Sequence, residues 1–302
     1  MRHTAEPLQQ VDRVFVRWHG RRLLYFAGCD YHRLASHPRV LAAARRGLKQ
    51  FGLNVAASRK TTGNHSLYEE LERALARFFQ AERAVLVSNG YLTNLAVAQA
   101  LCGEFTHALV DVRSHASLAD AAFALEATVV PFAHRQPADL KKQLGKLGNR
   151  TRPIVCTDGM FSHDGSAAPL AEYLAALPAN ALLLVDDSHG AGVLGPAGRG
   201  TPSHCHVRDA RVIQTITLSK ALGAFGGAIL GVGTHGAAFF IGIFKAVEHH
   251  VVVQHAMTDA IAPTCLGDEI RRIGHRLHAA GDHDIIGACH QRINTIDRRL
   301  HR

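Results

Sequence analysis

A single lysine stands at the end of an apolar stretch, among small and hydroxyl-bearing residues, in Thr215–Gly227 (TITLSKALGAFGG). Lys220 follows Thr217 and Ser219 and precedes alanine and glycine residues that leave room for a planar ligand. An amine in such surroundings can form a Schiff base with a carbonyl compound. The alternative is a solvated surface lysine, the usual situation of this residue type.

Two acidic residues and a histidine follow a second apolar stretch, in Leu182–Gly190 (LLLVDDSHG). Asp186 and Asp187 come directly after the apolar residues, and His189 lies three positions beyond Asp186. A carboxylate at the end of a buried strand is costly unless it is compensated, so the pair predicts either a functional role or a helix cap. A metal site would also use Asp and His, but the segment has no convincing third ligand, and no metal is predicted.

A third segment, Val85–Asn94 (VLVSNGYLTN), runs from an apolar strand through Ser88, Asn89 and Gly90 into a helix expected to begin near Tyr91. A strand, turn and helix in this order present free amide groups and the positive end of a helix dipole, which suit a phosphate. The alternative is an ordinary helix cap and turn, for which Ser-Asn-Gly is equally suitable.

The three segments together describe one ligand. A phosphate at a helix start, a carboxylate for a ring nitrogen and a lysine for an aldehyde are the parts of a pyridoxal phosphate site. An Asp beside the pyridine nitrogen keeps that nitrogen protonated by charge pairing, which makes the ring an electron sink. The sequence therefore predicts pyridoxal 5′-phosphate as the cofactor.

Short apolar stretches alternate with helical patterns through the middle of the chain. The stretches expected to be strands are Ala84–Ser88, Ala108–Asp111, Thr128–Phe132, Pro153–Thr157, Ala181–Asp186, Val212–Thr217 and Ala228–Gly231. Between them, Ser66–Phe79 and Tyr91–Leu101 have the apolar spacing of amphipathic helices. This alternation predicts an α/β fold with a mostly parallel sheet flanked by helices, and such sheets bind ligands at the carboxyl ends of their strands.

The composition is that of a globular protein: 302 residues, 47% hydrophobic and 20% charged, which excludes disordered, collagenous and coiled-coil classes. The net charge is +9, made up of +7 in residues 1–50, +4 in residues 271–302 and −2 in the residues between them. Basic ends attract polyanions such as nucleic acid, an acidic carrier protein or coenzyme A. No nucleic-acid motif accompanies them, so no nucleic-acid partner is predicted, and a cofactor-independent polyanion-binding protein is the third-ranked alternative.

Membrane and secretory signals are not found. No apolar stretch approaches the roughly 20 residues that a spanning helix needs, so no membrane partner is predicted. The start, MRHTAEPLQQVDR, lacks the apolar region of a secretory signal, which favours a cytoplasmic location. The six cysteines are scattered without C-x-x-C pairs and are interpreted as reduced, structural thiols.

From about Tyr25 to Gly231 the sequence resembles the α-oxoamine synthases, a family of fold-type I pyridoxal phosphate enzymes that includes 8-amino-7-oxononanoate synthase and 2-amino-3-ketobutyrate CoA ligase. The segments that carry the resemblance, in family order, are CDYHRLASHP, ASRKTTGNHSLYEELE, SNGYLTN, DVRSHASLADA, TDGMFSHDGSAAPL, VDDSHGAGVLGPAGRG and TLSKALGAFGG. The implied fold is the large domain of a fold-type I pyridoxal phosphate transferase, and the implied assembly is a homodimer.

The resemblance implies catalytic roles for four residues. Lys220 matches the lysine that forms the Schiff base, and Asp186 matches the partner of the pyridine nitrogen. His115 resembles the histidine that stacks on the cofactor ring, and His189 the one near its phenolic oxygen. For each histidine the alternative is a structural role.

The resemblance also implies further contacts with the cofactor. Ser162, in the FSHDG segment, matches a family cofactor contact. Thr217 and the amides of Gly90 and Tyr91 match the phosphate cradle, together with the turn residues Ser88 and Asn89.

The implied reaction is a decarboxylative condensation of an amino acid with an acyl thioester, carried on coenzyme A or acyl carrier protein, to an α-amino ketone. The activity resembles that of 8-amino-7-oxononanoate synthase in biotin biosynthesis. The alternatives are a truncated or decayed family member that binds the cofactor without turnover, and a 2-amino-3-ketobutyrate CoA ligase-like activity on glycine.

The sequence departs from the family pattern in three places. Cys29–Arg33 (CDYHR) replaces Asn-Asp-Tyr-Leu-Gly, and Tyr68 replaces a histidine, both where the acyl substrate is handled. Beyond about Gly231 nothing resembles the family's small C-terminal domain. The predicted division is an N-terminal segment (1–45), a cofactor-binding large domain (46–231) and an incomplete or atypical C-terminal region (232–302).

Overall fold

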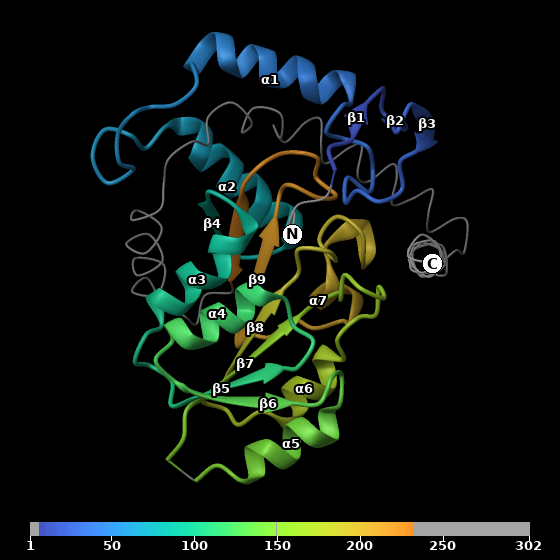
Figure 1. Ribbon diagram of the computed structural model, residues 1–302. Coiled ribbons are helices and arrows are strands. Elements are labelled where there is room, and N and C mark those ends of the chain that lie inside the picture. The colour runs from blue at the N-terminus through green and yellow to red at the C-terminus, as the bar shows by residue number, and fades with distance from the viewer. Residues whose placement is uncertain (1–5, 149, 232–302) are drawn as a thin grey trace.

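The computed structural model describes residues 6–148 and 150–231 (Figure 1). The atypical C-terminal region predicted for 232–302 lies outside the described residues. The boundary predicted between residues 45 and 46 falls inside helix α1 (Pro38–Phe51), and this division of the chain stays a prediction. Among the described helices, none has both the length and the apolar character needed to cross a bilayer.

A seven-stranded sheet forms the centre of the described chain, with the strand order β4-β10-β9-β8-β7-β5-β6. Its strands are β4 (Arg83–Val87), β5 (His107–Asp111), β6 (Thr128–Phe132), β7 (Pro153–Asp158), β8 (Leu182–Asp186), β9 (Val212–Thr217) and β10 (Gly227–Gly231). β10 pairs antiparallel with β4 and β9, and the other neighbouring strands of this sheet pair in parallel. The prediction of a mostly parallel α/β sheet is confirmed, and each predicted strand is present with its ends within one residue.

Helices cover both faces of the sheet, because alternate side chains of each strand point to opposite faces. The helices α3 (Gly90–Ala100) and α4 (Ala116–Ala124) pack on one face with Ala108, Val110 and Leu184. On the other face, α5 (Pro137–Gly145) and α6 (Leu170–Ala176) pack with Leu109 and Leu183. The helix α2 (Ser66–Phe79) covers that same face over β4, β10 and β9. The result is a three-layer α/β structure (Figure 1).

The predicted amphipathic helix Ser66–Phe79 is confirmed with the same bounds. Leu67, Leu71 and Leu75 recur every four residues, and all three are buried. The Nδ1 atom of His65 accepts a hydrogen bond from the amide of Leu67 and caps the start of the helix. Burial of this apolar stripe against the sheet, rather than helix propensity alone, stabilises α2.

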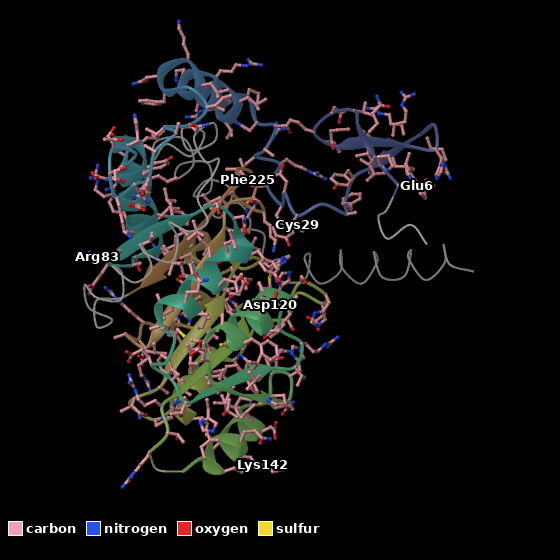
Figure 2. The ribbon with its side chains drawn as sticks, turned by 60° about the vertical axis from the view of Figure 1, so that its left-hand side comes forward. Glu6, Cys29, Arg83, Asp120, Lys142 and Phe225 are labelled. Atoms are coloured by element: carbon pink, nitrogen blue, oxygen red, sulfur yellow. The ribbon has the colours of Figure 1, made fainter. Side chains whose placement is uncertain are left out.

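A small antiparallel sheet precedes the large one, built from β1 (Gln9–Gln10), β2 (Phe15–Trp18) and β3 (Arg21–Leu24). The β2–β3 turn consists of His19 and Gly20, both with positive φ, as two-residue hairpins of this kind require. Figure 2 shows Glu6 beside this sheet and Lys142, on α5, at the far end of the molecule. The remaining elements are a 3₁₀ turn (Pro196–Gly198) and α7 (Thr201–His204).

Candidate active site

A cavity of about 210 Å³ opens at the carboxyl ends of the parallel strands. Seven of the ten predicted site residues line it: Gly90, Tyr91, His115, Asp186, His189, Thr217 and Lys220. Three residues that were not predicted complete the lining: Ser117, Asp158 and Ser188. The three predicted segments, separate in the sequence, therefore meet at one place, as the rule for parallel sheets requires.

The other three predicted residues do not line this cavity. Ser88 is buried at the end of β4. Asn89 is the N-cap of α3, where its side chain accepts a hydrogen bond from the amide of Leu92. Ser162 lies in the turn that follows β7, next to the buried Phe161. Their roles as cofactor contacts stay predictions.

The start of α3 approaches the end of β9 closely, and glycine at position 90 makes this approach possible. A Cβ atom on Gly90 would lie 2.7 Å from Cβ of Thr217 and 2.8 Å from its Oγ1. The first turn of a helix leaves its amides without partners inside the helix, and its dipole favours an anion there. This corner of the cavity therefore suits a phosphate, with the Thr217 hydroxyl beside the amides.

His115 is fixed at the opening of α4 by its own capping role. Its Nδ1 accepts a hydrogen bond from the amide of Ser117 and lies 2.8 Å from the Ser117 hydroxyl. Its backbone amide donates to Asp158 Oδ1 at 3.1 Å. The imidazole is thus oriented by local sequence, on the wall of the cavity, where a ring can stack on a planar ligand.

Asp186 is held by a buried network at the end of β8. Asn94 Nδ2 donates to its Oδ2 at 2.7 Å, and the Ser117 hydroxyl lies 3.4 Å from the same oxygen. The amide of Ser188 donates to Oδ1 at 3.1 Å. Thr215 Oγ1 donates to the side-chain oxygen Oδ1 of Asn94 at 2.7 Å, which orients the side-chain amide of Asn94. Asp186 therefore keeps one geometry without a ligand.

Asn94 was not among the predicted site residues. The signal was present, since Asn94 stands one turn after Gly90 in the SNGYLTN segment, on a helix face that is otherwise apolar. A fully buried amide on such a face needs a polar partner. Its partner, Asp186, lies 92 positions away in the sequence.

The adjacent carboxylate, Asp187, has a different role. It is fully buried and accepts hydrogen bonds from the amide of Thr201 at 2.9 Å, the Thr201 hydroxyl at 2.6 Å and Gln214 Nε2 at 2.7 Å. These bonds tie the start of α7 to the sheet. Of the two roles considered for the acidic pair, Asp187 therefore takes the structural one, and Asp186 faces the cavity.

Lys220, His189 and Tyr31 form a chain of contacts. Lys220 Nζ lies 2.6 Å from His189 Nε2, and His189 Nδ1 lies 2.6 Å from the hydroxyl of Tyr31. Burial lowers the pKa of Lys220, against the opposing effect of the Asp186 carboxylate. Burial also raises the pKa of Tyr31, so its hydroxyl keeps its proton. Tyr31 stands in the CDYHR segment but was not among the predicted site residues.

Asp158 is a second buried carboxyl group in the cavity, paired in register with Asp186 across β7 and β8. Burial, together with the nearby Asp186 carboxylate, raises the pKa of Asp158 to about 7. In the folded protein this group therefore holds its proton over a pH range in which an unfolded chain has lost it.

Replacement of Asp158 by asparagine is expected to change how stability depends on pH. Because the folded pKa lies above the unfolded one, Asp158 lowers the stability of the cofactor-free protein as pH rises from about 4 to about 7, by up to about 4 kcal/mol. Asn does not titrate, so the melting temperature of Asp158→Asn minus that of wild type should increase between pH 5 and pH 8. Equal pH dependence of the two melting temperatures would contradict this, and Asp120→Asn is the control.

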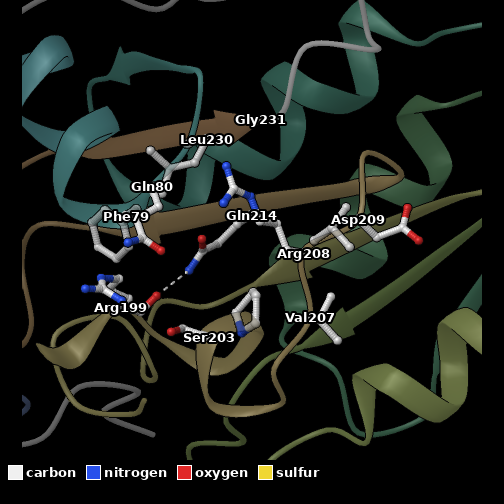
Figure 3. A pocket seen from close by; sticks show the side chains of 13 residues that line it. Phe79, Gln80, Arg199, Ser203, Val207, Arg208, Asp209, Gln214, Leu230 and Gly231 are labelled. Carbon is white, nitrogen blue, oxygen red and sulfur yellow. Dashed lines mark hydrogen bonds between the residues drawn. The ribbon is translucent and has the colours of Figure 1, made fainter. Parts of the chain in front are cut away.

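A second cavity lies at the opposite end of β9 (Figure 3), with a volume of about 90 Å³. Its polar lining includes Gln214, whose Nε2 donates to the carbonyl oxygen of Arg199 at 3.3 Å. None of the predicted site residues lines it. The cavity at the carboxyl ends of the strands is therefore the candidate active site.

Three features of this cavity fit pyridoxal phosphate. The first turn of α3 can take a phosphate, and the absence of a Cβ at Gly90 lets this turn lie directly against the Thr217 side chain. A buried carboxylate, Asp186, is available to a ring nitrogen. A lysine with a lowered pKa, Lys220, is available to an aldehyde.

Comparison with known proteins agrees with this geometry. Residues 23–279 match the family described as aminotransferase class I and II. The 8-amino-7-oxononanoate synthase of Thioalkalivibrio sulfidiphilus is 42% identical over 227 residues, which are 74% of this chain and 56% of that protein. A putative 8-amino-7-oxononanoate synthase of Desulforudis audaxviator is 38% identical over 234 residues, 77% of this chain and 61% of that protein.

A solved structure shows the same architecture. The serine palmitoyltransferase of Sphingomonas wittichii superposes with a TM-score of 0.79 at 28% identity, covering 88% of this chain and 66% of that one. The chain spans 56% and 61% of the lengths of the two curated relatives named above. The family match, the fold and the residues gathered in the cavity agree: the chain belongs to the class I and II aminotransferase family and has the fold of the fold-type I pyridoxal phosphate transferases.

Proposed function

We propose that this protein is a pyridoxal phosphate-dependent acyltransferase that condenses an amino acid with an acyl thioester, with loss of carbon dioxide, to an α-amino ketone. The observation that carries the proposal is the convergence of Lys220, His189 and Asp186 on one cavity at the start of α3. The curated relatives named 8-amino-7-oxononanoate synthase favour that activity over others in the family.

The chain's own residues would hold the cofactor at both ends. The amides of Gly90 and Tyr91 and the hydroxyl of Thr217 would bind the phosphate, His115 would cover one face of the ring, and Asp186 would meet the ring nitrogen. When bound, pyridoxal phosphate supplies an electron sink for a carbanion at the amino acid's α-carbon. The Asn94 contact at 2.7 Å would keep the Asp186 carboxylate in place throughout the reaction.

Lys220 would act as the amine that engages the cofactor and then moves the α-proton. We propose that the Tyr31 hydroxyl, which keeps its proton, donates to His189 Nδ1, so that the neutral imidazole carries its hydrogen on Nε2. That N–H faces Lys220 Nζ at 2.6 Å and can donate only to an unprotonated amine. The chain of contacts thus favours the neutral, nucleophilic form of Lys220, as burial does.

The acyl donor and the assembly follow from the resemblance and the charge distribution. Coenzyme A and acyl carrier protein, which carry the acyl group as a thioester, are polyanionic. The chain has a net charge of +9 with basic ends, which would attract such a carrier. We propose a cytoplasmic homodimer that acts on such a thioester.

The first experiment is the visible spectrum of the purified full chain with pyridoxal phosphate, before and after addition of glycine, alanine or serine. A cofactor band that one amino acid shifts, followed by carbon dioxide release with acyl-CoA or acyl carrier protein, would support the proposal and identify the substrates. A response confined to glycine would favour the aminoketobutyrate ligase-like activity. A band that no amino acid shifts would indicate a protein that binds the cofactor without turnover and would overturn the proposal.

A Tyr31→Phe variant should attach the cofactor only at higher pH. Without the hydroxyl, His189 can place its hydrogen on Nδ1 and accept a proton from Lys220, which favours the protonated amine. The midpoint of cofactor attachment, followed by absorbance against pH, should rise by about one pH unit. Tyr25→Phe is the matched control, and an unchanged midpoint in Tyr31→Phe would show that Tyr31 does not set this tautomer.

A further inference from the structure

A group of side chains that could bind a metal lies outside the active-site cavity. It consists of His134, His163 and Asp164, whose candidate ligand atoms all lie within 4.8 Å of one another. His134 stands in the turn after β6, and His163 and Asp164 stand in the turn after β7. The DDSH segment lacks a third ligand, so no metal was predicted from the sequence; His134, His163 and Asp164 lie in other segments.

His134 has the surroundings of a metal-bound imidazole. Its Nδ1 lies 3.0 Å from Oδ1 of Asp111, a fully buried carboxylate, and its ring packs edge-on against Phe161. Within the described part of the chain its Nε2 is buried and has no hydrogen-bonding partner. A buried nitrogen in this state is unfavourable and calls for a water or an ion. A metal-bound histidine usually donates its other N–H to a carboxylate, as the contact with Asp111 would allow here.

The other two groups face the same space. His163 Nε2 lies 3.4 Å from Oδ2 of Asp164, close to the separation of about 3.3 Å that two ligands of a tetrahedral zinc ion would have. The second oxygen of Asp164, Oδ1, is occupied by the amide and hydroxyl of Ser166, at 2.9 Å and 2.7 Å. Oδ2 is therefore the oxygen of Asp164 that is directed at His163.

One cation competes for this position. A guanidinium nitrogen of Arg113 lies 3.8 Å from Asp164 Oδ2. The Arg113 side chain is 52% exposed, so it can turn into solvent at small cost when a divalent ion takes its place. The candidate ligand atoms lie within 4.8 Å of one another and must come closer together to bind one ion. The side chains of His163 and Asp164 are 34% and 42% exposed, so they can make this adjustment.

We propose that His134 Nε2, His163 and Asp164 bind a divalent transition metal such as Zn²⁺, with Asp111 hydrogen-bonded to the first histidine and water in the fourth position. Two imidazoles and a carboxylate are a ligand set that zinc accepts, with one position left open. The proposal does not depend on the acyltransferase activity.

The site would link three neighbouring strands. Asp111 is the last residue of β5, and His134 and His163 follow β6 and β7; the three strands lie side by side in the order β7-β5-β6. His115 and Asp158 of the cavity lie on two of the same segments, after β5 and at the end of β7. A bound metal would therefore stabilise the edge of the sheet that carries the active site, since a ligand of the native state alone raises its stability.

The test measures Zn²⁺ binding to the full chain by competition with a chromophoric chelator, for wild type, His163→Ala and His204→Ala. The chain has 21 histidines, so weak binding elsewhere is expected and the comparison between variants decides. The proposal requires that His163→Ala lose one zinc equivalent or at least about tenfold in affinity, while His204→Ala, an exposed histidine elsewhere, matches wild type. Equal stoichiometry and affinity in all three proteins would overturn it.

Two further measurements keep the test specific. Zn²⁺ should raise the melting temperature of wild type and His204→Ala more than that of His163→Ala. Anomalous scattering at the zinc edge from wild-type crystals should give a peak between His134 and His163. A peak only elsewhere, or an equal thermal shift in all three proteins, would contradict the site even if His163→Ala folds poorly.

Discussion

Replacement of Lys220 by alanine will remove covalent attachment of pyridoxal phosphate and reduce turnover on the order of 10³-fold or more. Among the described residues that line the cavity, Lys220 is the only lysine, and its Nζ lies 2.6 Å from His189 Nε2. Burial lowers its pKa, which raises the fraction of nucleophilic amine near neutral pH. The other described lining residues offer no side-chain amine in its place.

The measurement is the visible spectrum with cofactor, together with carbon dioxide release with the best amino acid and thioester. Lys142→Ala is the matched control, because Lys142 lies on α5 at the far end of the molecule (Figure 2). Cofactor that borohydride reduction fixes covalently to Lys220→Ala would mean that another amine is used. Melting temperatures of both variants establish that the comparison is between folded proteins.

Replacement of Asp186 by asparagine should reduce turnover on the order of 10²-fold or more while leaving Lys220 free to attach the cofactor. The neutral amide cannot pair with a protonated ring nitrogen, so the electron sink weakens. The substitution can keep only one of the two bonds, because Asn94 Nδ2 donates to Oδ2 and the amide of Ser188 donates to Oδ1, whereas the asparagine NH2 group accepts neither, so the melting temperature of the variant is measured alongside. The measurement is the turnover number with saturating amino acid and thioester.

Asp187→Asn provides the control for this second prediction, since the two carboxylates are neighbours with different partners. Asp187 accepts from Thr201 and Gln214 inside the protein, so its replacement should lower the melting temperature and leave turnover per folded molecule nearly unchanged. Equal losses of turnover in the two variants would show that Asp186 has no special part in the chemistry.

The sequence alone determined the fold class and most of the residues that line the cavity. Strand and helix positions follow from apolar periodicity, which is local, and the ends of the seven predicted strands differ from the observed ones by one residue at most. Seven of ten predicted site residues line the cavity, because each ends or closely follows a strand whose carboxyl end meets the others at one edge. Lys220, Asp186 and His189 could all be predicted in this way.

Only the tertiary structure decided which of these residues touch. Asn94 meets Asp186 across 92 positions, Tyr31 meets His189 across 158, and the pair Asp186 and Asp187 separates into a cavity residue and a structural one. The group of His134 and His163 exists because β6 and β7 both flank β5. Periodicity shows where a strand lies and which face is buried, but strand order and side-chain contacts depend on packing between segments far apart in the chain.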